Sequence, residues 1–222
     1  MVGTVALVGG GEFRASGDVD RVLLERAGVD RVLVLPTAAA YEHPDRAVSA
    51  AEAWFADLGA GADGLPVLAR PDASVAAYVD AVRASRFTYL TGGSPMHLRS
   101  VLKDTPLWTA LVEAVHDGAV VAGSGAGAMV LTDPMVDPRG GAFTLGLGLV
   151  PSLAVVPGAD QWSHDRLHRT LELARGFPVL TIATGAAAVR HDGRWTMHGE
   201  VVVHLDGQEV GPEALSPGVS SR

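Results

Sequence analysis

Short apolar runs alternate with amphipathic stretches along most of the chain, and this alternation is the strongest constraint on its fold. The apolar runs, which are typical of buried strands, lie at 4–9, 31–37, 64–69, 87–92, 119–124, 153–156 and 178–183. Stretches with helical spacing, such as 18–28 and 43–58, separate most of these runs. Strands that alternate with helices favour parallel pairing, with helices on both faces of the sheet. We therefore predict a three-layer α/β/α sandwich around a mostly parallel, doubly wound sheet.

The end of the chain follows a different pattern. The segment 186–207, "AAAVRHDGRWTMHGEVVVHLDG", contains an Asp-Gly turn and predicts a C-terminal β-hairpin. No linker, charge run or internal repeat interrupts residues 1–210, so we expect a single domain over that range. The last residues, 211–222, are predicted to form a flexible tail.

Composition narrows the functional classes. The chain has no cysteine, which excludes disulfides, thiolate catalysis and cysteine-ligated zinc. Its formal charge of −8 and its scattered 17 lysines and arginines argue against a nucleic-acid partner and an anionic membrane surface. No His-Glu-x-x-His metalloprotease motif occurs, no apolar run reaches the roughly 20 residues of a membrane span, and the N-terminus lacks a basic signal-peptide region. We therefore expect a cytoplasmic protein without a metal or cofactor.

Three predicted strand ends carry glycines. They read "GGGE" (9–12), "TGGSP" (91–95) and "GSGAGA" (123–128). Ligands of doubly wound sheets bind at the carboxyl ends of the strands, so these segments are the candidate site. The first segment lacks the spacing of a dinucleotide fingerprint, and each segment is also compatible with a simple turn or with close packing.

Six segments together resemble a known family. They read "LVGGGEF", "VLVLPTAAAY", "YLTGGSPMHL", "VVAGSGAGAMVL", "LGLGLVPSLAVVP" and "WTMHGEVVVHLDG". In this order they resemble the dipeptidase E and cyanophycinase family of serine peptidases, nearly from end to end. The resemblance implies a fold like that of the class I glutamine amidotransferases, which is flavodoxin-like.

The resemblance also implies a catalytic triad, and this chain departs from it. The family's nucleophile turn has serine in its third position, where this chain has Gly125, while Ser124 falls in the variable position before it. The family histidine aligns with Gly158 and the family acid with Thr184, although Asp160 remains nearby. Because triad members act as a unit, loss of nucleophile and base together disables a peptidase. We therefore predict no catalytic residue at these positions, and a binding or regulatory protein.

The resemblance leaves a binding pocket in place. It implies backbone N–H donors at Ala126 and near Gly93 that accept an anionic group. The predicted ligand-binding residues are Gly92, Gly93, Ser124, Gly125, Ala126 and Asp160. Candidate partners for an acidic ligand are Arg14, Arg99 and Arg166. The expected ligand is a small peptide or an amino-acid-like molecule, and a homodimer is consistent with the resemblance.

An active enzyme is the alternative. The stretch "AGSGA" (122–126) also fits a looser elbow pattern with Ser124 as the nucleophile. A shift of one residue would then pair Ser124 with His164 in a serine hydrolase. The two readings differ in backbone geometry, because the residue at the apex of an elbow has a positive φ. We predict a positive φ at Gly125 and strand geometry at Ser124.

Overall fold

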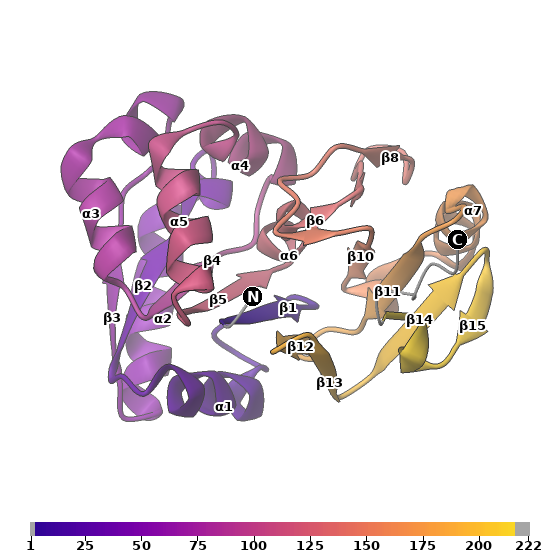
Figure 1. Cartoon of the computed structure of the whole chain (residues 1–222), viewed down its shortest axis with the longest axis horizontal. Coiled ribbons are helices and arrows are strands. Elements are labelled where there is room, and N and C mark those ends of the chain that lie inside the picture. The colour runs from indigo at the N-terminus through magenta and orange to yellow at the C-terminus, as the bar shows by residue number, and fades with distance from the viewer. Residues whose placement is uncertain (1–2, 216–222) are drawn as a thin grey trace.

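A seven-stranded, mostly parallel sheet forms the centre of the larger part of the protein (Figure 1). The computed structural model describes residues 3–215. In spatial order the strands are β13 (Arg194–His198), β12 (Ala187–His191), β1 (Thr4–Val8), β5 (Val120–Ser124), β4 (Phe87–Leu90), β2 (Arg31–Leu35) and β3 (Gly61–Gly64). Strands β1, β5, β4, β2 and β3 run parallel, whereas β12 and β13 pair antiparallel at one edge. The predicted parallel sheet and C-terminal hairpin are confirmed.

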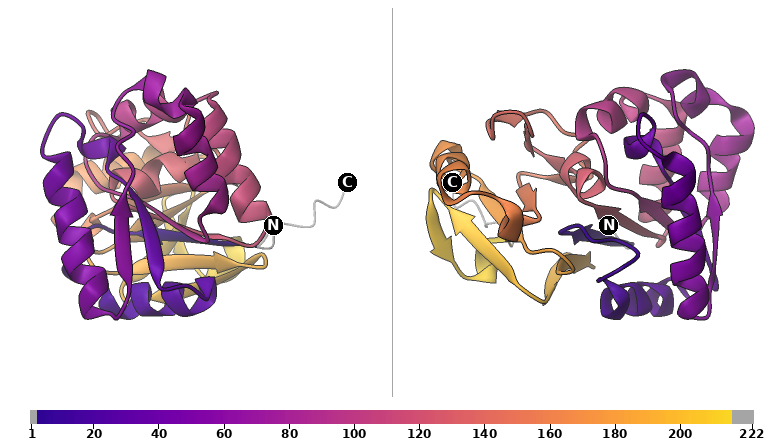
Figure 2. Two further views of the ribbon diagram at one scale, coloured as in Figure 1. Left: turned by 90° about the vertical axis from the view of Figure 1, so that its left-hand side faces the viewer. Right: turned by 180° about the vertical axis from the view of Figure 1, so that it is seen from behind.

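Helices cover both faces of this sheet, because alternate strand residues point to opposite sides. In β1, Val5 and Leu7 pack into one hydrophobic cluster, and Ala6 and Val8 pack into the other. On the Val5 side lie α3 (Ala76–Ala84), α4 (Pro95–Leu102), α5 (Pro106–His116) and α6 (Ala126–Leu131); on the other lie α1 (Gly17–Ala27) and α2 (Pro44–Asp57). The left view of Figure 2 shows helices on both sides of the strands. The three layers are as predicted.

Local sequence signals place the connections between strands and helices. Helix α4 begins after Ser94, whose Oγ accepts the N–H of His97 at 3.3 Å. Helix α1 ends at Gly28, which takes the left-handed conformation with φ 64°. Such signals set where each helix starts and stops. Because β1, β5 and β4 are parallel neighbours, the loops that follow them lie at one edge of the sheet.

A second, four-stranded sheet holds most of the C-terminal third. Its order is β10 (Ala154–Pro157), β11 (Pro178–Ile182), β14 (Val201–Leu205) and β15 (Gln208–Val210). Helix α7 (His164–Leu173) connects β10 to β11, which are parallel. This sheet lies beside the edge of the main sheet formed by β12 and β13 (Figure 1). The sequence predicted strands here but not their assignment to a separate sheet, because periodicity does not specify pairing partners.

Shorter elements complete the described chain. The two-residue strands are β6 (Thr132–Asp133), β7 (Met135–Val136), β8 (Phe143–Thr144) and β9 (Val150–Pro151), and the 3-10 helices are η1 (Thr37–Ala39), η2 (Arg70–Ser74), η3 (Ala159–Gln161) and η4 (Pro212–Leu215).

Two stretches differ from the sequence expectations. The third strand covers 61–64 rather than 64–69, where Pro66 has no N–H to give to a sheet. The predicted tail begins with η4, whose Ala214 and Leu215 pack against the core. The rest of that tail, 216–222, lies outside the described residues.

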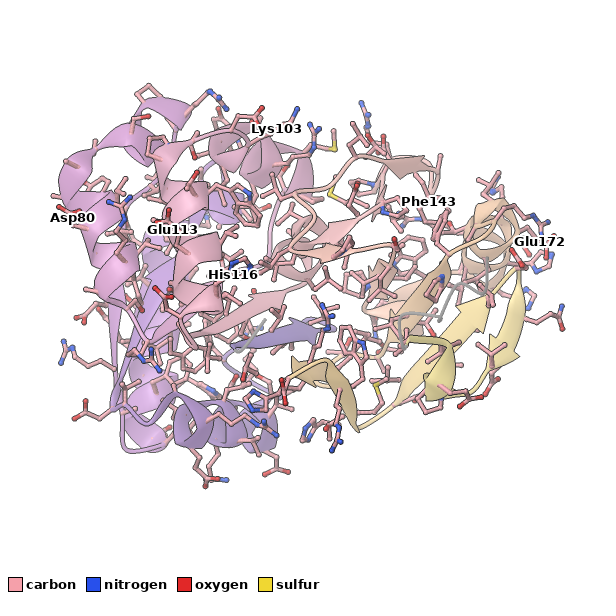
Figure 3. The ribbon with its side chains drawn as sticks, in the orientation of Figure 1. Asp80, Lys103, Glu113, His116, Phe143 and Glu172 are labelled. Atoms are coloured by element: carbon pink, nitrogen blue, oxygen red, sulfur yellow. The ribbon has the colours of Figure 1, made fainter. Side chains whose placement is uncertain are left out.

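Charged side chains lie on the outer faces of the helices. Asp80 on α3, Glu113 on α5 and Glu172 on α7 are exposed (Figure 3). Within residues 3–215, no helix combines the length and the apolar character that crossing a membrane requires.

Candidate ligand-binding site at the strand–helix elbow

The chain turns sharply at Gly125, between β5 and α6. Gly125 has φ 52° and ψ −108°, whereas Ser124 is the last residue of β5. The N–H of Gly125 donates to the carbonyl of Val8, and the carbonyl of Gly125 accepts the N–H of Met129, both at 3.0 Å. A positive φ between a buried strand and a helix is the geometry of a nucleophile elbow. The prediction that Gly125, rather than Ser124, forms its apex is confirmed.

Crowding explains the glycines on either side of the apex but not Gly125 itself. A Cβ on Gly123 would lie 2.4 Å from the backbone of Gly127, and a Cβ on Gly127 would lie 2.4 Å from the carbonyl oxygen of Leu90. A Cβ on Gly125 would meet only the Cα of Gly92, at 3.7 Å. A side chain therefore has room at the apex, and only the backbone conformation disfavours one.

Ser124 points into the protein and not toward His164. Its side chain is fully buried, and its Oγ donates to Oε2 of Glu12 at 2.7 Å. The side chain of His164 is 93% exposed, and its Nδ1 lies 3.7 Å from Oδ1 of Asp165. A base in solvent cannot deprotonate a buried hydroxyl that is bonded elsewhere. The alternative pairing of Ser124 with His164 is therefore not formed in this structure.

Glu12 is a site residue that sequence reasoning missed. Its Oε1 accepts the N–H of Gly92 at 2.7 Å, while its Oε2 accepts the hydroxyl of Ser124. A Cβ on Gly92 would lie 2.7 Å from Oε1, so the carboxylate reaches this N–H because residue 92 is glycine. The sequence did contain a signal for this role, because Glu12 directly follows three glycines at the end of a predicted strand. Doubly wound sheets bind ligands at that edge.

The predicted binding residues of the second and third loops gather around this carboxylate. Gly92 contacts Glu12 directly and lies next to the apex at Gly125, while Ala126 begins α6. Gly93 has φ 130°, and a Cβ there would lie 2.3 Å from the carbonyl oxygen of Ala38. An N–H donor near Gly93 is that of Gly92, and it already donates a hydrogen bond to the Glu12 carboxylate.

The positions aligned with the family's base and acid lie beside the first glycine loop. Gly158 has φ 62°, and a Cβ there would lie 3.3 Å from the carbonyl oxygen of Gly9. The backbone N–H and the hydroxyl of Thr184 both donate to Oδ1 of Asp160, at 2.7 and 3.0 Å. A hydrogen bond from Gln161, and then the bonds from Thr184, lower the pKa of Asp160. Asp160 thus ties the loop after β10 to the loop after β11.

A buried acid lies close enough to Glu12 to interact with it electrostatically. Asp20 is fully buried and accepts hydrogen bonds from the Ser16 hydroxyl at 2.8 Å and from the Trp54 indole at 2.9 Å. Burial raises the pKa of Asp20 from 3.8 to about 6, and the charge of Glu12 adds to this shift. Burial also raises the pKa of Tyr89, with contributions from Asp20 and Glu12. Acidic and hydroxyl side chains therefore lie close together in this part of the interior.

The three candidate arginines do not contact the predicted site. Arg166 donates to the carbonyl of Pro138 at 2.6 Å, and its guanidinium lies 3.7 Å from the ring centre of Trp162. Arg14 is exposed, and Arg99 is half-buried on α4. In the described part of the chain, none of the three forms a hydrogen bond with a predicted ligand-binding residue.

Within the described residues, neither a metal cluster nor the best-defined cavity coincides with the predicted site residues. Across residues 3–215, no group of three or more His, Cys, Asp or Glu side chains is placed to hold a metal ion. A cavity of about 380 Å³ is lined by Val150, Pro151, Ser152, Leu153, Gly176, Pro178, Arg190, Trp195, Ala214 and Leu215. It contains none of the predicted site residues, so the elbow remains the candidate site.

The fold and the elbow together define a class. The fold is a three-layer α/β sandwich, and its glycine-lined strand–helix turn is of the kind that carries the nucleophile in hydrolases. The model of peptidase family S51 matches residues 5–198. The chain belongs to peptidase family S51.

Individual relatives agree with this assignment. The chain is 28% identical over 174 residues to a cyanophycinase of Nostoc sp. (strain PCC 7120 / SAG 25.82 / UTEX 2576), covering 73% of this chain and 57% of the relative. It is 31% identical over 180 residues to a cyanophycinase of Synechococcus elongatus, covering 74% and 53%. The chain thus spans a little over half the length of these relatives.

Solved structures show the same fold. The crystal structure of a peptidase from an acI-B1 Actinobacterium has a TM-score of 0.84 and 28% identity, covering 95% of this chain and 93% of that one. A putative peptidase E protein from Listeria monocytogenes EGD-e has a TM-score of 0.67 and 17% identity, covering 95% of this chain and 100% of the other.

Proposed function

We propose that this member of family S51 is catalytically inactive and binds a small peptide or an amino-acid-like ligand at the elbow. The observation that carries the proposal is the glycine at the elbow's apex. Gly125 has the backbone geometry of a nucleophile and no side chain with which to attack.

The aligned base and acid positions support the same conclusion. A serine hydroxyl becomes an effective nucleophile only when a base removes its proton, and the base needs an orienting partner. Gly158 supplies no imidazole, and Thr184 is engaged with Asp160 instead of holding a base. Loss of the unit costs about 10⁴- to 10⁶-fold in rate in triad enzymes. Backbone N–H donors do not depend on the triad side chains, so they remain when those side chains are lost. The site therefore keeps groups that can bind a ligand.

Labelling and turnover test this proposal. We expect no covalent labelling by a fluorophosphonate probe and no release of product from aspartyl dipeptides or cyanophycin. Ser124→Ala is the matched variant, because it removes the hydroxyl beside the apex. Stoichiometric labelling of the native protein that maps to Ser124 by mass spectrometry, and that disappears in Ser124→Ala, would overturn the proposal in favour of an active serine hydrolase.

Two further parts of the proposal come from the sequence and the resemblance. They are a cytoplasmic location and assembly as a homodimer.

A further inference from the structure

We propose that Glu12 sets the charge preference of the elbow site: it keeps ligand carboxylates away from the N–H of Gly92 and pairs with a cationic nitrogen of the ligand. The inference rests on the proposed function, since it describes what the same site selects. It differs from the expectation that the N–H donor near Gly93 accepts an anionic group of the ligand.

Both oxygens of the Glu12 carboxylate accept hydrogen bonds, Oε1 from the N–H of Gly92 and Oε2 from the hydroxyl of Ser124. The N–H that would otherwise be free to receive a ligand's anionic group therefore already has an anionic partner. A ligand carboxylate would have to displace Glu12 and would meet a like charge at close range.

No basic side chain pairs with Glu12 in the described part of the chain. Across residues 3–215, no arginine, lysine or histidine forms a salt bridge with Glu12. A carboxylate has about four acceptor sites, and Gly92 and Ser124 use two of them. Glu12 is only partly buried, so the remaining sites are available to an ammonium or guanidinium group.

The apex of the elbow has open space where a side chain would begin. The apex at Gly125 carries no side chain, and a Cβ placed there would meet nothing nearer than the Cα of Gly92 at 3.7 Å. That space adjoins the residue whose N–H binds Glu12. A cationic group entering beside Gly125 therefore comes next to the carboxylate.

The test compares two probes that differ in charge. Native protein labelled with ¹⁵N is titrated with L-argininamide, which carries no carboxylate, and with N-acetyl-L-aspartate, which carries no amine. The readout is the chemical shift of the Gly92 and Gly125 amides. The variant is Glu12→Gln, which keeps an acceptor but removes the charge, and the matched control is Glu25→Gln on the exposed surface of α1.

We expect native protein and Glu25→Gln to bind L-argininamide at least about tenfold more tightly than N-acetyl-L-aspartate. This difference in affinity corresponds to the free energy of one hydrogen bond to a charged group. Glu12→Gln should lose that preference. Equal affinities in native protein, a preference for the aspartate probe, an unchanged preference in Glu12→Gln, or no shift with either probe would each overturn the inference. If Glu12→Gln fails to fold, the relative affinity of the native protein for the two probes still tests the inference.

Failure of the proposed function looks different. It would show as fluorophosphonate labelling, whatever the charge preference of the site is.

Discussion

The hydroxyl of Ser124 donates a 2.7 Å hydrogen bond to Oε2 of Glu12, a residue 112 positions earlier in the chain. The same carboxylate accepts the N–H of Gly92, so one side chain connects the ends of β1, β4 and β5. This contact holds the only hydroxyl of the elbow turn inside the protein. It leaves Gly125, which has no side chain, at the position from which a nucleophile would attack.

The backbone of Gly125 leads to a prediction about stability. Gly125→Ala should lower the free energy of unfolding by about 1–3 kcal/mol, because a residue with a Cβ is strained at φ 52° although space is available. Gly140→Ala is the control, since a Cβ there meets nothing within 4 Å and no positive φ is required. Chemical denaturation measures both variants. Equal stability of the two would show that the apex conformation is not strained.

The triad positions lead to a prediction about repair. Gly125→Ser alone should not hydrolyse aspartyl dipeptides, because the new hydroxyl has no base. Adding Gly158→His and Thr184→Glu should give more activity than any single change, since the members act as a unit. The control combines Gly125→Ala with the same two changes and should remain inactive. Robust turnover by Gly125→Ser alone would mean that another group already serves as the base.

Asp20 leads to a prediction about pH. Its pKa is raised from 3.8 to about 6, so the folded state favours the protonated form. The stability that Asp20 contributes is therefore present below about pH 4 and is lost as the pH rises through about 6. Asp20→Asn stays neutral and keeps an acceptor for Ser16. Relative to native protein, this variant should gain up to about 3 kcal/mol between about pH 4 and about pH 8.

Unfolding in denaturant at several pH values measures this gain. Asp18→Asn on the same helix is the control, because its side chain is fully exposed. If the difference between Asp20→Asn and native protein does not change with pH, Asp20 titrates normally in the folded state.

Sequence patterns were sufficient to predict the layers of the fold and the apex of the elbow. Apolar runs with a strand pattern and amphipathic stretches with a helical pattern are local signals, and they placed β1, β2, β4, β5 and their helices close to where the structure has them. The apex at Gly125 was predicted from the resemblance to the family's nucleophile turn, a pattern that lies within six residues.

Contacts between distant segments could not be predicted in this way, because they form only in the folded chain. That β14 pairs with β11 instead of extending the β12–β13 hairpin depends on packing across the fold, which no local period encodes. The role of Glu12 depends on strand order, because the end of β1 reaches the ends of β5 and β4 only in the assembled sheet. Charge at a pocket results from side chains far apart in sequence, so the acidic character of this elbow became visible only in three dimensions.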